Sequence, residues 1–285
     1  MENKMEEISS QRKLEALEEN GTFIRKDGKT FLQLDCENAK ELSMKWGEKL
    51  YPFTKTGKKW ILELPFSTPV NYVQICIDGQ EVLSPELPIA HGYGRPYNYI
   101  ELPDEDGLFE LRDVPHGTLT QEFYKSQISD NWEKLILYLP PCVPSAGLPV
   151  LYLQHGFGES EISWSTTGKV NLLMDNLIAA GKIKPFAIVM GNGMVKQRID
   201  GELKLNRALY GQMLVEEILP MIEKKYQFGG SKEKRGMAGL SMGSVQTTRT
   251  ICEHPELFSE VGLFSGFLRH RIVGDEEHDG IISKA

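Results

Sequence analysis

Gly239-Leu240-Ser241-Met242-Gly243 is the most informative pattern in this chain. A serine between glycines at this spacing is typical of a sharp turn from a strand into a helix, with the serine at the apex. The turn strains the backbone at Ser241 and brings the helix too close for larger flanking side chains. The apolar run 235–238 predicts a buried strand, and 244–252 predicts a helix that ends near His254-Pro255. An ordinary glycine-rich turn is the alternative explanation.

The residues upstream and downstream alternate between strand and helix patterns. Such alternation predicts a parallel or mixed sheet with helices on both faces. The apolar run 149–154 leads directly into His155-Gly156-Phe157-Gly158. The series comprises an antiparallel pair at 118–126 and 134–139, strands at 149–154, 186–190 and 261–265, and helices at 170–180 and 210–225. With the serine turn included, this order matches the α/β-hydrolase fold up to its sixth strand.

Residues before about 105 follow a different pattern. Alternating runs such as 30–34 and 60–64 predict short strands, and Asp78-Gly79 predicts a tight hairpin turn. These features indicate a small, immunoglobulin-like β-sandwich. Residues 84–117 are rich in proline, glycine and tyrosine, which predicts an ordered crossing segment rather than a helix or a central strand. We therefore expect an N-terminal helix over 1–21, the sandwich with its crossing segment over 22–105, and the α/β-hydrolase domain over 106–285.

Composition excludes several classes of protein. The 285 residues, 40% of them hydrophobic, can bury one large core and a second smaller one. A net charge of −8 argues against a nucleic-acid partner, and no apolar run approaches the length of a membrane span. The charged first twenty residues do not resemble a signal peptide, so the chain as written is expected in the cytoplasm, or outside the cell if a leader was removed.

No metal-ligand spacing and no phosphate-binding glycine loop occurs, so neither a metal nor a cofactor is expected. The cysteines are far apart in the sequence and form no C-x-x-C pair, so we expect buried free thiols. They are Cys36, Cys76, Cys142 and Cys252.

A serine at the apex of such a turn points to acyl transfer, with Ser241 as the nucleophile. The tetrahedral intermediate carries an oxyanion that needs backbone N–H donors. The expected donors are Met242, directly after the serine, and Phe157, in the loop after the third strand. A plain strand-to-helix turn is the alternative for that loop. His155 is expected to be a structural hydrogen-bonding residue rather than a base, and Trp164 is the best candidate to line an acyl pocket.

Five segments form a specific joint pattern. They are Arg112-Asp113-Val114-Pro115-His116-Gly117-Thr118, 149–158, 171–179, 184–190 and 238–243. Together they resemble the esterase D-type esterases, and within them the first family of carbohydrate esterases, which includes feruloyl and acetyl-xylan esterases. Members of that family often carry an N-terminal early-set, glycogen-binding-like β-sandwich, so the resemblance extends over nearly the whole chain from about residue 22.

This resemblance implies hydrolysis of an ester that links a small acyl group to plant cell-wall carbohydrate. Ser241 takes the position of the nucleophile, and Phe157 and Met242 take the oxyanion positions. The chain departs from the family pattern at Gly191-Asn192-Gly193, where Pro-Asn-Gly is commoner, and at Ser244-Val245, where two glycines are usual. The nucleophile position is retained despite these departures, and the wall of the pocket is expected to differ from the family pattern.

Two other functions remain open at this point. The same acyl-enzyme could pass its acyl group to an alcohol, as in the related mycolyltransferases, which would make the protein an acyltransferase. A noncatalytic carbohydrate-binding homologue is the alternative outside enzymology. The expected partner is a small acyl ester or an acylated carbohydrate. We expect the sandwich to pack against the hydrolase domain through segment 93–99 and to help cover the site.

The acid and histidine of an α/β-hydrolase triad follow the serine in the chain. Residues 242–285 follow Ser241, and its helix and the strand at 261–265 use about half of them. We therefore expect the acid and histidine positions to fall beyond residue 285, with weak activity and self-association through an exposed sheet edge as consequences. Asp275, His270 and His278 are the only local substitutes.

Overall fold

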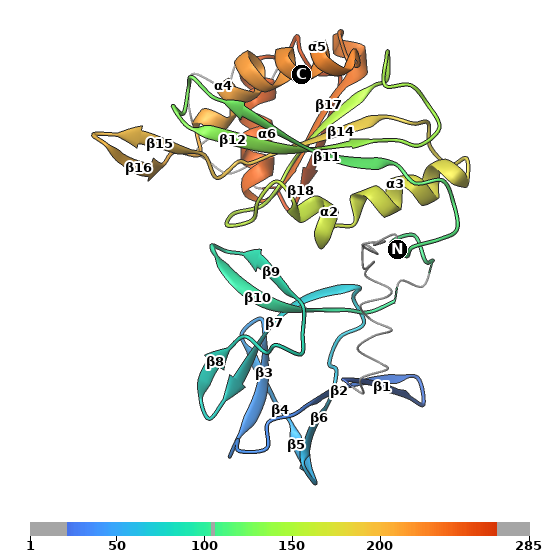
Figure 1. The fold of residues 1–285 in the computed structure, drawn as a ribbon, viewed down its shortest axis with the longest axis vertical. Coiled ribbons are helices and arrows are strands. Elements are labelled where there is room, and N and C mark those ends of the chain that lie inside the picture. Colours follow the sequence, from blue (N-terminus) through green and yellow to red (C-terminus); the bar gives the residue numbers. More distant parts are fainter. Residues whose placement is uncertain (1–21, 104–105, 267–285) are drawn as a thin grey trace, which may run out of the picture. The chain divides into compact units, whose positions relative to one another are not determined.

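The computed structural model describes residues 22–103 and 106–266 (Figure 1). The helix expected at 1–21 and the three substitutes for the triad, Asp275, His270 and His278, lie outside these residues. The chain divides into two compact units: the first extends to Asp113 without Gly92–Gly94, and the second comprises Gly92–Gly94 and the residues from Val114. Each unit has a hydrophobic core of its own.

The first unit consists of two antiparallel sheets. One has the strand order β1-β2-β6-β5, and the other has the order β4-β3-β7-β10-β9 with β8 paired to β7. The alternating runs expected to be strands fall in β2 and β6, which pair from Phe31↔Glu63 to Leu34↔Trp60. The bounds are β1 Phe23–Lys26, β2 Lys29–Leu34, β3 Leu42–Trp46, β4 Lys49–Pro52, β5 Thr54–Thr56, β6 Lys59–Glu63, β7 Val70–Ile77, β8 Gln80–Val82, β9 Ile89–Gly92 and β10 Arg95–Glu101.

The hairpin between β7 and β8 turns at Asp78 and Gly79, as the sequence predicts. Both residues have positive φ, 49° and 81° respectively, which is the combination that a two-residue type I′ turn requires. Ile77 pairs with Gln80 across it. Leu32 of one sheet and Ile75 of the other belong to the same buried cluster, so the two sheets share a core.

One expectation for this unit is wrong. The segment 84–117 contains β9 and β10, and β10 lies between β7 and β9 within the sheet. Pro96 is compatible with this position because pairing with β7 begins only at Asn98↔Val73, so the N–H that proline lacks is not needed on that side. Ile100 is buried. The segment therefore contains a central strand despite its prolines.

The second unit is built on a six-stranded sheet with the order β11-β12-β14-β13-β17-β18. The first two strands form the expected antiparallel pair, and β13, β14, β17 and β18 run parallel to one another. Their carboxyl ends therefore meet at one edge of the sheet, which we call the carboxyl edge. The bounds are β11 Thr118–Lys125, β12 Trp132–Leu139, β13 Val150–Gln154, β14 Ala187–Gly191, β17 Arg235–Leu240 and β18 Glu260–Phe264.

Helices cover both faces of this sheet (Figure 1). In the view shown, α2 and α3 lie below the sheet and α4 and α5 lie above it. The bounds are α2 Ser163–Thr166, α3 Val170–Ala179, α4 Leu209–Met213, η1 Leu214–Ile218, α5 Leu219–Tyr226, the 3₁₀ turn η2 Lys232–Lys234 and α6 Met242–Glu253. A strand-helix sandwich with this order of elements is of the α/β-hydrolase type.

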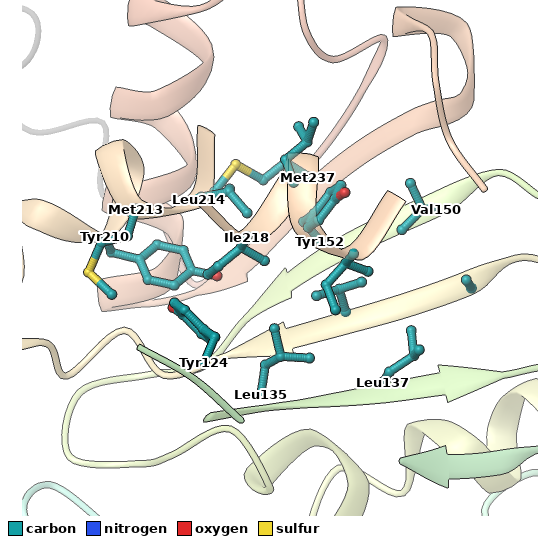
Figure 2. Close-up of a cluster of buried hydrophobic side chains, with 14 of the residues drawn as sticks. Tyr124, Leu135, Leu137, Val150, Tyr152, Tyr210, Met213, Leu214, Ile218 and Met237 are labelled. Atoms are coloured by element: carbon teal, nitrogen blue, oxygen red, sulfur yellow. The ribbon is translucent and has the colours of Figure 1, made fainter. Parts of the chain in front are cut away.

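Alternate residues of the central strands supply a core on each face of the sheet. Leu135 and Leu137 of β12 belong to the larger cluster, together with side chains such as Ile218 (Figure 2). Ile136 of the same strand belongs to the smaller cluster, which includes Met174 of α3. This division follows from the two-residue period of a strand, which directs successive side chains to opposite faces.

The helix expected at 210–225 has three parts, α4, η1 and α5, and η1 has π geometry. Pro220 lies in the first turn of α5. Because proline has no N–H, it cannot complete the i→i−4 ladder, and a π turn is a common local adjustment to such a break. Leu214 and Ile218 remain buried in the core throughout.

The four cysteines are free, as expected, but they are not all buried. Cys142 is exposed because it lies in a turn after β12, where its φ is 61°. Within residues 22–103 and 106–266, no helix is both long and apolar enough to cross a bilayer.

Candidate active site

Ser241 lies at the turn from β17 into α6, with a φ of 52° and a ψ of −107°. This combination is unfavourable for a residue with a Cβ, at a cost of roughly 1–3 kcal/mol. Two backbone hydrogen bonds hold it: the Ser241 N–H donates to the Phe264 carbonyl at 2.9 Å, and the Ser241 carbonyl accepts from Val245 N–H at 3.2 Å. The surrounding structure thus maintains a strained serine at the carboxyl edge.

The glycines on either side of Ser241 permit the close approach of β17, α6 and β13. A Cβ on Gly239 would lie 2.3 Å from the backbone of Gly243. A Cβ on Gly243 would in turn lie 2.6 Å from the Gln154 carbonyl oxygen and 2.8 Å from that of His155. These distances are far below normal van der Waals contact, so the two positions accept no larger residue without a backbone shift.

The loop after β13 lies beside this turn. The two strands are parallel neighbours, with Gln154 paired to Gly239 at their ends, so the loop and the first turn of α6 leave the sheet at the same place. Phe157 in this loop is 40% exposed, and Met242 is buried. Within residues 22–103 and 106–266, neither of their backbone N–H groups donates a hydrogen bond to the protein. Two free N–H donors beside a serine are what an oxyanion requires.

His155 fixes the start of the loop. Its ring is 1% exposed, Nδ1 lies 2.8 Å from the Gly156 carbonyl oxygen, and Nε2 accepts the Gly193 N–H at 3.0 Å. Because Nε2 accepts, the proton of the neutral ring is on Nδ1. Burial lowers the pKa of His155 below its ordinary value of 6.5. Both ring nitrogens are therefore engaged with backbone groups, as expected for a structural histidine.

This histidine makes the fold sensitive to acid. Because its pKa is lowered in the folded state, the unfolded chain binds a proton first as the pH falls below 6.5. The contribution of His155 to stability is thus complete above 6.5 and is lost as the pH falls toward its folded-state pKa. We expect the free energy of unfolding to decline more steeply below pH 6.5 in the wild type than in His155→Gln. Urea titrations across this range measure both slopes, and equal slopes would contradict the assignment.

Two acidic residues follow this loop, a half-buried Glu159 and a buried Glu161. Glu159 Oε2 accepts the Gly156 N–H at 2.8 Å, and burial raises the pKa of Glu159 while this hydrogen bond opposes the rise. The Glu161 side chain is 1% exposed and pairs with Lys134 of β12 at 2.7 Å. The sequence analysis assigned no role to either residue, although two acidic residues directly after a glycine-rich loop were visible in the sequence.

Trp164 follows on α2, and its ring lies 6.0 Å from that of Phe264 between centroids. Phe264 pairs with Leu240, the residue before the serine. The structure therefore brings Trp164 into the neighbourhood of the turn, where the sequence analysis placed it as a candidate wall of an acyl pocket.

The sequence analysis did not predict a hairpin over 196–205, formed by β15 Lys196–Ile199 and β16 Glu202–Leu205. Asp200-Gly201, with φ values of 53° and 82°, forms its turn, and this dipeptide is a known hairpin signal. Arg207, just after the hairpin, lies with its Cζ 5.1 Å from the centre of the Phe157 ring. A charged residue thus reaches the loop from a segment distant in sequence.

No histidine in residues 22–103 and 106–266 hydrogen-bonds the Ser241 hydroxyl. His254 lies at the far end of α6 and pairs with Glu256 at 3.6 Å. His116 pairs with Asp175 at 2.9 Å, but this pair is near the end of β12 that lies away from the carboxyl edge, since Tyr138 aligns with Ile188 early in β14. The described residues therefore bring together the candidate nucleophile, Ser241, and the two candidate oxyanion donors, and no histidine among them lies at the serine as a base.

The Asp175 carboxylate has a structural role instead. It is 2% exposed, and it accepts from the Tyr138 hydroxyl at 2.6 Å and from the Gly117 N–H at 3.0 Å as well as contacting His116. Asp175→Ala leaves the buried Tyr138 hydroxyl and the half-buried Gly117 N–H without this acceptor, so we expect it to lower the free energy of unfolding by about 2 kcal/mol. His116→Ala removes only the partly exposed partner of Asp175, so it should lower the free energy of unfolding by less than Asp175→Ala does. Urea denaturation of both variants compares the costs, and a larger loss in His116→Ala would contradict this ranking.

In the same described residues, no group of three or more histidine, cysteine, aspartate or glutamate side chains is arranged to hold a metal ion.

Comparisons with known proteins point to esterases. A family model described as "Putative esterase" matches residues 126–277. A curated "Endo-1,4-beta-xylanase/feruloyl esterase" from Xylanibacter ruminicola is 36% identical over 213 residues, which are 72% of this chain and 29% of the relative. The chain thus spans less than a third of the length of this relative.

Solved structures show the same fold. A ferulic acid esterase from Anaeromyces mucronatus, in complex with ferulic acid, is 20% identical with a TM-score of 0.53, over 59% of this chain and 64% of that one. The enterobactin esterase of Shigella flexneri is 13% identical with a TM-score of 0.61, over 92% of this chain and 77% of that one. Since the family model covers more than half of the chain, the protein belongs to this esterase family.

Proposed function

We propose that the protein is a serine ester hydrolase in which Ser241 forms the acyl-enzyme. The observation that carries this proposal is the strained serine at the carboxyl edge, with φ of 52°, next to two backbone N–H groups that donate to no protein acceptor in the described chain. The Ser241 oxygen bonds to the substrate carbonyl carbon, and the alcohol leaves with a proton. Water then attacks the acyl carbon and releases the acid and the free serine.

The N–H groups of Met242 and Phe157 stabilise the oxyanion of both tetrahedral intermediates in this proposal. Support comes from the parallel neighbours β13 and β17, which bring both residues to one edge. Activation of the hydroxyl requires a base. In this fold the acid and histidine follow the serine in the chain, so the base belongs to the sequence after β18.

For the substrate, we propose feruloyl or acetyl esters of plant cell-wall carbohydrate. The name of the Xylanibacter ruminicola relative supports this class, and Trp164 and Phe264 place two aromatic rings near the serine turn, where a planar acyl group could pack. The two antiparallel sheets of residues 22–103 share one core, which supports an immunoglobulin-like sandwich that precedes the hydrolase unit in the chain.

A substrate panel tests this proposal. Methyl ferulate, acetylated xylan and short nitrophenyl esters are incubated with the protein, and released acids are measured by chromatography. Hydrolysis of methyl ferulate or acetylated xylan at rates above those of the short esters is the expected result. Equal rates for all of them would contradict the substrate class. Adding an alcohol acceptor separates a hydrolase from an acyltransferase, because a transferase forms the new ester in preference to the acid.

A further inference from the structure

Arg207 is held at the carboxyl edge by the helix that carries the serine. The Gln246 side chain, in the second turn of α6, donates from Nε2 to the Arg207 carbonyl oxygen and to the Gly193 carbonyl oxygen, both at 3.0 Å. Gly193 is the residue whose N–H donates to His155. One buried amide therefore connects the base of the β15–β16 hairpin to the serine helix and, through Gly193, to the loop of Phe157.

The Arg207 side chain is exposed and its guanidinium lies over the Phe157 ring, with 5.1 Å from Cζ to the ring centre. Stacking on an aromatic face holds a guanidinium in place, and it leaves the N–H groups at the edge available for hydrogen bonds. The backbone N–H of the same Phe157 is the proposed oxyanion donor. A substrate whose carbonyl oxygen accepts a hydrogen bond from the Phe157 N–H therefore has Arg207 as a near neighbour.

Arg207 differs from the other arginines of residues 22–103 and 106–266. Each of the others has a partner within the protein, whether a carboxylate, a carbonyl or another group: Arg25, Arg95, Arg112, Arg198, Arg235 and Arg249. For the Arg207 guanidinium, stacking on the Phe157 ring is the one interaction that these residues provide, since it makes no hydrogen bond or ion pair with them. A fixed guanidinium with uncommitted donors is suited to bind a carboxylate in the bidentate mode.

We propose that Arg207 is a specificity-determining residue that binds a carboxylate carried by the substrate close to its scissile ester. This proposal rests on the proposed function, because it assumes that the ester is bound at Ser241. The carboxylate has two sources, the acyl group or the sugar alcohol, as in a uronic acid. In both cases the guanidinium attracts a carboxylate. The added attraction appears as a higher kcat/KM for the anionic ester than for the matched neutral ester.

The test uses one pair of esters for each source. Mono-4-nitrophenyl glutarate and 4-nitrophenyl pentanoate differ in an acyl-side carboxylate, and a monoacetylated methyl glucuronide and the matched methyl glucoside differ in an alcohol-side carboxylate. We expect Arg207→Gln to reduce kcat/KM about tenfold for the anionic member of one pair, mainly through KM, and to change the neutral member less than about twofold. Arg207→Lys keeps the positive charge but lacks the planar guanidinium that binds a carboxylate through two N–H groups. Its kcat/KM for the anionic ester should therefore lie between those of the wild type and Arg207→Gln.

Arg198→Gln is the matched control. Arg198 is an exposed arginine of the neighbouring β15–β16 hairpin, and its guanidinium donates to the Gly201 carbonyl. Arg198→Gln should leave both pairs unchanged. An equal loss for anionic and neutral esters in Arg207→Gln would overturn the proposal, as would no loss in either pair or the same selective loss in Arg198→Gln. The source of the carboxylate is identified by the pair that responds.

A binding measurement separates failure of this proposal from failure of the proposed function. The anionic and neutral acetylated sugars are titrated calorimetrically into Ser241→Ala and into Ser241→Ala/Arg207→Gln. Tighter binding of the glucuronide that disappears in the double variant supports the role of Arg207 even if the wild type hydrolyses neither ester. If the wild type hydrolyses the esters and no variant discriminates between charges, the serine assignment stands and the proposal for Arg207 is wrong.

Discussion

Ser241→Ala is expected to reduce ester hydrolysis by several orders of magnitude, to the residual rate that the oxyanion donors and substrate binding provide. The hydroxyl is the only group proposed to bond to the substrate carbon, and removal of a nucleophile in such a site leaves only the contribution of the oxyanion donors and of binding. The substitution removes one oxygen and keeps the backbone that holds the turn, so the fold should remain. Steady-state rates with the ester panel give the loss, and circular dichroism confirms the fold.

Ser244→Ala is the matched control for this experiment. Ser244 is buried in the first turn of α6, and its hydroxyl oxygen lies 2.7 and 2.9 Å from the Gly239 and Phe264 carbonyl oxygens, which share its single proton. Its loss should lower the free energy of unfolding by about 1 kcal/mol and change the rate far less than Ser241→Ala does. A fluorophosphonate should label the wild type and Ser244→Ala at one serine and leave Ser241→Ala unlabelled. Retention of most activity by Ser241→Ala would refute the assignment.

Gly239→Ala is expected to have the largest effect on stability, a loss of roughly 3–5 kcal/mol. The added methyl group would lie 2.3 Å from the carbonyl carbon and oxygen of Gly243. These are backbone atoms of α6, which is itself packed against the carbonyls of Gln154 and His155, so the helix cannot move away without opening the loop of Phe157. Thermal denaturation should show a fall of about 6–15 °C, together with loss of activity.

Gly236→Ala, in the same strand, is the control for this prediction. A Cβ on Gly236 would have its nearest neighbours at 3.4 Å, in the Glu260 and Leu151 side chains, which is at the border of ordinary contact. Neither glycine has a positive φ, so the two substitutions differ in space and not in backbone strain. We expect Gly236→Ala to remain within about 1 kcal/mol of the wild type. Equal losses in both variants would show that β17 resists any side chain and that the approach of α6 is not the cause.

Much of the hydrolase unit could be predicted because its patterns are local. The run of residues 149–153 is continuously apolar, and the structure has β13 there, with four of its five residues buried. The glycines around Ser241 indicated a turn with close backbone approach, and the φ of 52° at Ser241 and the 2.3 Å clearance at Gly239 agree with that reason. Each of these features depends on a few neighbouring residues, which the sequence displays directly.

Two parts of the fold were missed or mistaken because local signals conflict there. The prolines of 84–117 argue against a central strand, yet β10 lies inside its sheet because Pro96 precedes the residues that pair with β7. The hairpin of β15 and β16 was overlooked although Asp200-Gly201 carries a turn signal, because its strands are only four residues long and largely exposed. Local propensity gives no weight to pairing partners that are distant in the sequence.

The sequence by itself determined the serine turn, the order of strands and helices in the second unit and the esterase resemblance, because each depends on residues close together in the chain. Only the tertiary structure decided which side chains surround the turn. His116 proved to bind Asp175 away from the carboxyl edge, and Arg207 proved to stack on Phe157. The reason is physical: the direction of a strand and its place in the sheet set where its ends lie, and these depend on long-range pairing that local spacing does not encode.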